Sequence, residues 1–238
     1  WSKITAELPS RQGDDAGASL AVDFDLRPGQ EKTVRIVLTW YAPEWQGERD
    51  NRYTQMYTVR YRDSVEVARR LATDHASLLK RVLAWQQAVY AARDIPGWLS
   101  DCLVNSLCLM TEDSIWALPR EPLGDWGLQS GVYGQYESPR DCANVECIVC
   151  SWYAHLPLDY FFPELARSAL RTMASHMRED GAPPFRLGRD MDIDVPSPLY
   201  EYQAPLNAVC LVDMVDRLWQ CTGDDTVVYE FYDAVKRS

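Results

Sequence analysis

The sequence predicts a mainly helical protein that is preceded by short β-strands. Apolar residues alternate with polar ones through residues 19–41, which is the period of half-buried strands. From Asp63 onward, apolar residues recur every three or four positions, which is the period of amphipathic helices. The chain of 238 residues is 47% hydrophobic and 25% charged, so it has enough apolar material for a core.

The first part of the chain predicts two strands joined by a turn. Residues 20–26 and 34–40 each alternate, and Arg-Pro-Gly-Gln at 27–30 supplies a fixed φ at the proline and a permissive φ at the glycine. Because two strands do not make a stable sheet alone, the rest of the sheet is expected upstream of this chain. We therefore assign residues 1–45 to the last strands of a β-domain and residues 46–62, which lack periodicity, to a linker.

Residues 63–238 predict a series of amphipathic helices. The first is capped by Asp63 or Ser64 and ends before Pro96, which starts the second. Further helices are predicted at 163–180, at 205–222 and after Asp224 or Asp225, and the first two of these stop at Gly181 and Gly223. The segments 117–143 and 182–204 are predicted to be loops, and loops of such length inside a domain are usually functional.

Composition and motifs disfavour several classes of function. The net charge of −11 argues against a nucleic-acid partner, and no apolar run approaches the ~20 residues that span a bilayer. The signatures of serine hydrolases, P-loop NTPases and dinucleotide-dependent dehydrogenases are absent from the sequence. No obligate protein partner is evident either. The first residue, Trp1, is not an initiator methionine, and both ends are expected to be cut from a longer protein.

The strongest candidate for a functional site is a polar and aromatic cluster between residues 125 and 152. Its carboxylates are Glu137, Asp141 and Glu146, accompanied by Arg140, Trp126, Tyr133, Tyr136 and Trp152. Hydrolysis of a glycoside needs a carboxylate beside the anomeric carbon and a second one as acid, and pyranose rings stack on aromatic side chains. The alternative is that Arg140 pairs with Asp141 while the other acids are solvated surface. His155 follows close by and could contact a ligand.

Three of the seven cysteines, Cys142, Cys147 and Cys150, have a spacing found among the thiolate ligands of plant-type iron–sulfur clusters. Such a cluster needs a fourth thiolate and a wrapping loop, and the next cysteine is Cys210. Buried core thiols are therefore the favoured interpretation, with an iron–sulfur or zinc site as the alternative, and no metal or cofactor is predicted. An odd number of cysteines spread over a long chain predicts mostly reduced thiols, which favours a cytoplasmic location.

Several blocks of the sequence resemble glycoside hydrolase family 116, the non-lysosomal or bile-acid β-glucosidases and glucosylceramidases with their bacterial relatives. Phe-Asp-Leu-Arg-Pro-Gly-Gln-Glu at 24–31 and Val-Arg-Ile-Val-Leu-Thr-Trp-Tyr-Ala-Pro at 34–43 resemble the close of the family's N-terminal β-sandwich. Ile-Pro-Gly-Trp-Leu-Ser-Asp at 95–101 resembles the start of its (α/α)6 barrel, and Phe-Phe-Pro-Glu-Leu at 161–165 and Leu-Trp-Gln-Cys-Thr-Gly-Asp at 218–224 resemble later barrel segments. The resemblance implies that residues 63–238 are the first part of such a barrel.

The same resemblance implies retaining hydrolysis of a β-glucoside or a related glycoside. Glu137 takes the place of the nucleophile, and Glu146 takes the place of a carboxylate that holds sugar hydroxyls. Asp141, Arg140, Trp126, Tyr136 and Trp152 are expected to contact the substrate. The acid/base carboxylate of the family follows these helices, so it is expected beyond Ser238, and the chain alone is expected to be inactive.

Two alternatives to a β-glucosidase stay open at this point. The first is a different glycoside, such as a uronide bound by Arg186 or Arg189, because the family carries a histidine where this chain has Phe-Arg-Leu-Gly-Arg at 185–189. The second is a non-catalytic carbohydrate-binding protein built on the same helical toroid.

Overall fold

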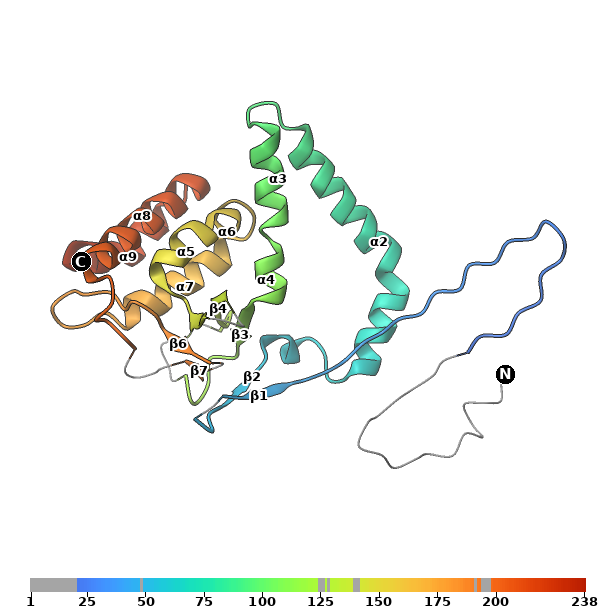
Figure 1. The fold of residues 1–238 in the computed structure, drawn as a ribbon, viewed down its shortest axis with the longest axis horizontal. Helices are drawn as coiled ribbons and strands as arrows, with labels where there is room; N and C mark the ends of the chain where they lie inside the picture. The colour runs from blue at the N-terminus through green and yellow to red at the C-terminus, as the bar shows by residue number, and fades with distance from the viewer. Residues whose placement is uncertain are drawn as a thin grey trace. The chain divides into compact units, whose positions relative to one another are not determined.

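The computed structural model describes residues 21–47, 49–123, 127, 129–138, 142–190, 192–193 and 198–238. The chain divides into two units, Trp1–Thr39 and Trp40–Ser238. All the helices and strands that the structure describes lie in the second unit (Figure 1). This unit is mainly helical, as predicted, but it also contains an antiparallel sheet that the sequence did not reveal.

Residues 21–39 contain the predicted turn but not the predicted strands. The Gln30 amide donates to the Arg27 carbonyl at 2.9 Å, and Gly29 has a φ of 77°, as the third residue of a type II turn requires. The alternating apolar side chains on either side are exposed, among them Phe24, Leu26, Ile36 and Leu38. The prediction of strands is wrong for these residues. Alternation of apolar and polar residues shows only that a sheet could bury one face of the segment, whereas a strand also needs a neighbouring strand for its backbone hydrogen bonds.

The segment predicted to be a linker forms a small hairpin, β1 Glu44–Gln46 with β2 Arg52–Thr54, followed by the 3-10 helix η1 Met56–Val59. Trp45 stacks on Tyr53 with ring centroids 4.9 Å apart. The carboxylate of Asp192 accepts a hydrogen bond from the Arg49 amide at 2.8 Å, which ties the hairpin to the main sheet. Cross-strand aromatic packing therefore orders a segment that shows no periodicity in the sequence.

The long helix α2, Ser64–Ala91, begins where the sequence predicts. The Asp63 carboxylate accepts a hydrogen bond from the Glu66 amide at 2.7 Å and caps the first turn. The helix has no buried residue, so its predicted apolar face is not covered, although Trp85 meets Phe161 edge to face at 5.0 Å. The next predicted helix is divided into α3 Gly97–Asn105 and α4 Cys108–Glu112.

A five-stranded antiparallel sheet occupies the segments that were predicted to be loops. Its strands, in the order of the sheet, are β3 Ser114–Ala117, β4 Val132–Ser138, β5 Cys142–Val145, β6 Gly188–Arg189 and β7 Asp192–Ile193. The loop prediction is wrong here because the first five residues of β4 are all buried, so the strand has no apolar–polar alternation to detect.

Five helices gather beside this sheet (Figure 1): α5 Ile148–Ala154, α6 Leu156–Phe161, α7 Pro163–Ser175, α8 Ala204–Thr222 and α9 Asp225–Arg237. The helix α7 ends before the predicted 180, and Gly181 (φ 91°) lies in a separate turn against the Arg237 carbonyl. The predicted boundary between α8 and α9 is confirmed, since Gly223 has a φ of 63° and the Asp224 carboxylate caps α9. Side chains of these helices form the larger core, which includes Leu211, Leu218 and Phe231.

Exposed apolar side chains on the helices lead to a prediction about behaviour in solution. Leu79 and Val82 on α2 and Val209 on α8 are each more than half exposed, at 58%, 51% and 64%. We expect the 238-residue chain on its own to self-associate or to remain loosely packed, and to bind a hydrophobic dye strongly, because such faces are rarely left in water. Scanning calorimetry with light scattering tests this expectation. A sharp, cooperative transition of a monomer with little dye binding would contradict it.

Candidate active site

A β-bulge between β4 and β5 sets the position of Glu137. Tyr136 pairs with Val145 and Ser138 pairs with Cys142, so two residues of β5 lie opposite Glu137 alone. Such a bulge changes the direction of side chains beside it. Glu137 therefore lies at the exposed end of a strand. The sequence had predicted a loop at this position.

The carboxylate of Glu137 is held by donors from β5. Asn144 Nδ2 donates to Oε2 at 2.9 Å, and Cys142 Sγ donates to the same oxygen at 3.2 Å. The Arg186 guanidinium donates to Asn144 Oδ1 at 2.5 Å, so the amide of Asn144 turns its nitrogen toward Glu137. Partial burial raises the pKa of Glu137, but hydrogen bonds from Asn144 and from nearby thiols outweigh it and hold the pKa below its usual value. Glu137 is therefore ionised at neutral pH.

A small cavity of about 60 Å³ lies beside Glu137. It is lined by Leu109, Gln135, Tyr136, Glu137, Cys147, Cys150, Ser151, Tyr153 and Ala154. Ligand pockets for small molecules usually have volumes of ~300–1,000 Å³. The cavity is therefore too small for a sugar ring, and a glycoside would have to approach Glu137 from its exposed side.

Glu146 lies behind this site and is completely buried, with 0% of its surface exposed. Its Oε1 accepts a hydrogen bond from the Gln135 amide at 2.6 Å and lies 3.2 Å from His155 Nε2, and its Oε2 accepts from Ser151 Oγ at 2.7 Å. The backbone of Glu146 has a φ of 49°, which is uncommon for a residue with a side chain. Both carboxylate oxygens thus bind the protein itself, where the sequence analysis expected them to bind sugar hydroxyls.

His155, also 0% exposed, is the buried partner of Glu146 and forms an ion pair with it when its imidazole is protonated. Burial disfavours the imidazolium, but the carboxylate of Glu146 reverses that effect and raises the pKa of His155. A second, partly buried pair follows on α6, where Asp159 Oδ2 accepts from Arg217 Nε of α8 at 2.5 Å. The imidazole that the sequence analysis considered for ligand contact is therefore part of an internal polar network.

Residues 2–80 match the family model of beta-glucosidase 2, glycosyl-hydrolase family 116 N-term. This part of the chain is therefore similar to the N-terminal domain of glycoside hydrolase family 116. The match covers the first unit, the β1–β2 hairpin and part of α2, so Glu137, Glu146 and their neighbours lie outside it. A comparison with curated proteins finds no match.

The other predicted contact residues do not all gather at Glu137. Tyr136 lines the small cavity but is only 9% exposed and belongs to the core of the sheet. Trp152 on α5 is 43% exposed, its Nε1 donates to Asp213 on α8 at 2.6 Å, and it is not among the residues that line the cavity. Trp126, Arg140 and Asp141 lie outside the described residues.

The residues that orient the two glutamates could not be predicted from the sequence. Asn144 holds Glu137, while Ser151 and the Gln135 amide hold Glu146. The position of Ser151, five residues after Glu146 and in the middle of the short helix α5, gives only a weak signal in the sequence. The contact between Asn144 and Glu137 depends on the bulge, which nothing in the sequence indicates.

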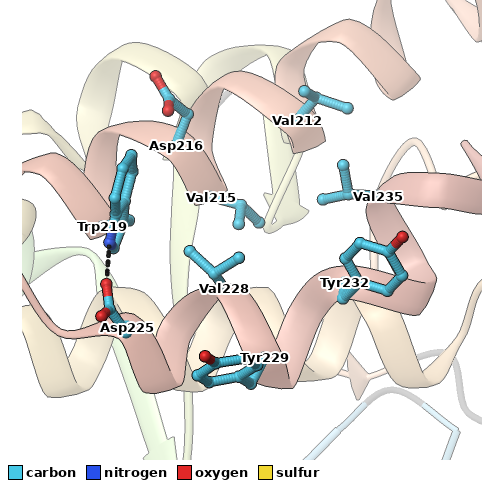
Figure 2. A pocket seen from close by; sticks show the side chains of 9 residues that line it. All are labelled: Val212, Val215, Asp216, Trp219, Asp225, Val228, Tyr229, Tyr232 and Val235. Atoms are coloured by element: carbon cyan, nitrogen blue, oxygen red, sulfur yellow. Dashed lines mark hydrogen bonds between the residues drawn. The ribbon is translucent and has the colours of Figure 1, made fainter.

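A larger groove, of about 480 Å³, lies between α8 and α9 (Figure 2). Val212, Val215, Asp216, Trp219, Asp225, Val228, Tyr229, Tyr232 and Val235 line it. Trp219 Nε1 donates to Asp225 Oδ1 at 3.0 Å, and the rest of the lining is mostly apolar. The groove is separate from Glu137 and shows where the predicted apolar stripes of these helices remain uncovered. None of the described helices is long and apolar enough to cross a membrane.

Proposed function

We propose that this chain is the part of a retaining glycosidase that carries the nucleophile, and that Glu137 is this nucleophile. The observation that supports the proposal most is the state of its side chain. Glu137 is exposed, has a lowered pKa and accepts a hydrogen bond from Asn144 at 2.9 Å. A nucleophilic carboxylate has to be ionised, accessible and oriented, and these features meet the three requirements.

In the proposed mechanism, Glu137 attacks the anomeric carbon of a β-glucoside or related glycoside. The bond to the aglycone breaks, and a covalent glycosyl-enzyme forms. Water then attacks the same carbon and releases Glu137, with help from an acid/base carboxylate. We place that second carboxylate outside residues 1–238, on the remainder of an (α/α)6 barrel of which the helices from α2 onward form the first part. Trp126, Arg140, Asp141 and Trp152 remain candidates for sugar contacts.

Glu146 has a positioning role in this proposal. Its bonds to the Gln135 amide and to Ser151 connect β4 with the start of α5, and so fix the strand that carries Glu137. Arg186 acts on the carboxylate of Glu137 through Asn144. Arg186 is engaged in this way, and Arg189 Nε lies 3.0 Å from Asp190 Oδ2. Because both arginines have partners in the protein, we propose a neutral glucoside, not a uronide, as the substrate.

The stereochemistry of the product tests the proposal. The gene product that contains this chain is incubated with an aryl β-glucoside, and proton NMR follows the anomeric configuration of the first glucose released. The double displacement predicts the β-anomer first, with the α-anomer appearing later by mutarotation. First release of the α-anomer would contradict a covalent intermediate. Binding of the glucoside without any hydrolysis would favour the non-catalytic carbohydrate-binding alternative.

A further inference from the structure

Three thiols surround the carboxylate of Glu137. Cys147 caps α5 and Cys150 lies in its first turn, where the Cys150 amide donates to the Cys147 carbonyl at 2.9 Å. The ligand atoms of Glu137, Cys147 and Cys150 all lie within 4.8 Å of one another. From β5, Cys142 Sγ reaches Glu137 Oε2 at 3.2 Å, but it lies outside the group of atoms that are all within 4.8 Å of one another. All three cysteines are free thiols.

This set has the number and type of ligands that a zinc site requires. Zinc prefers four ligands in a tetrahedron, with Zn–S distances of ~2.3 Å and Zn–O distances of ~2.0–2.2 Å, which places the ligand atoms roughly 3.5–3.8 Å apart. The atoms of Glu137, Cys147 and Cys150 would need to approach by about 1 Å or less to reach this spacing. Cys142, which already contacts Glu137, would have to move closer to Cys147 and Cys150 to supply the fourth ligand.

We propose that Glu137, Cys142, Cys147 and Cys150 bind one thiophilic divalent cation of the Zn²⁺ class. A carboxylate among thiolates favours such an ion over an iron–sulfur cluster, which is usually held by four cysteines. The remaining cysteines belong to other elements: Cys102 to α3, Cys108 to α4, and Cys210 and Cys221 to α8. Binding replaces the protons of the three thiols with bonds to the cation.

The proposed ion uses the same carboxylate that glycoside hydrolysis requires. A cation bound to Glu137 neutralises the attacking oxygen, so the metal-loaded protein cannot form the glycosyl-enzyme. The cluster would therefore act as an inhibitory site for thiophilic metals. The metal site itself rests on the arrangement of the four side chains and does not depend on the proposed glycosidase activity.

Titration with Co²⁺ tests the site, because the absorption spectrum of Co²⁺ changes when thiolates coordinate it. The gene product that contains this chain, kept reduced with a phosphine, is titrated while the thiolate-to-cobalt charge-transfer absorption is recorded, and Zn²⁺ is then added to displace Co²⁺. We expect saturation at one equivalent and complete reversal by Zn²⁺. The variants Cys147→Ser and Cys150→Ser should lower the affinity at least ~10-fold. The matched control Cys102→Ser, an exposed thiol on α3, should bind as the unaltered chain does.

Two results would overturn the inference. One is the absence of a one-equivalent transition in the unaltered chain, and the other is a transition that both cysteine variants retain. Cys147 is buried, so if its variant shows a changed circular dichroism spectrum, the half-buried Cys150 decides the outcome. Failure of this titration would leave the glycosidase proposal intact, because hydrolysis needs only a metal-free Glu137.

Discussion

Replacement of Glu137 with glutamine is expected to lower kcat for an aryl β-glucoside by about 10⁴-fold or more, with little change in substrate affinity. The amide keeps the shape of the side chain but cannot form the covalent intermediate. Steady-state kinetics of the gene product that contains the chain measure the effect. Glu164→Gln, an exposed glutamate at the start of α7, is the matched control and should leave kcat unchanged.

Azide distinguishes loss of the nucleophile from a general loss of structure. A small anion can enter the space that an alanine leaves at this position, so Glu137→Ala should regain part of its activity in azide and give a glycosyl azide as product. If both variants at Glu137 retained most of their activity, or if azide rescued a variant of Glu146 and neither variant of Glu137, the assignment of the nucleophile would be wrong.

Replacement of His155 with alanine is expected to destabilise the fold by about 3–5 kcal/mol, because it leaves the buried carboxylate of Glu146 without its buried partner. Urea unfolding monitored by tryptophan fluorescence measures the change. His75→Ala, on the exposed surface of α2, is the control and should alter stability by less than about 0.5 kcal/mol. Equal stability of the two variants would refute the role given to the Glu146–His155 pair.

The same pair predicts the direction of a pH effect. The folded-state pKa of His155 is raised, so its contribution to stability is fully present below the unfolded value of about 6.5 and is lost as pH rises through the folded value. The free energy of unfolding of the unaltered gene product that contains this chain should therefore fall from slightly acidic to alkaline pH more steeply than that of its His155→Ala variant. Parallel pH profiles would contradict this.

The parts of the fold that could be predicted from sequence are those with local signals. Asp63 and Asp224 are capping residues with short polar side chains, and Gly223 takes the left-handed conformation that ends a helix, so these boundaries agree with the structure. The sheet was missed because β4 is buried on both faces and β6 and β7 have two residues each. After residue 63, the helical period of apolar residues is therefore the strongest signal in the sequence.

The candidate site was predictable in residue type but not in arrangement. Resemblance to a family pointed to Glu137 and Glu146, yet their opposite environments, one exposed and one buried, depend on a bulge and on a positive φ. The spacing of Cys142, Cys147 and Cys150 indicated that thiols would gather. Their fourth neighbour, Glu137, comes from the adjacent strand, and local sequence does not reveal such a contact.

Covalent trapping tests most directly whether Glu137 is the nucleophile. A 2-fluoro-β-glucoside with a dinitrophenolate leaving group needs no acid catalyst to form the glycosyl-enzyme, so it can label a protein that lacks that group. Tryptic cleavage after Arg120 and Arg140 separates Glu137, in the peptide 121–140, from Asp141 and Glu146 in the peptide 141–167. We predict that mass spectrometry finds the fluoroglucosyl group on the first peptide, at Glu137. A label on the second peptide would contradict the assignment.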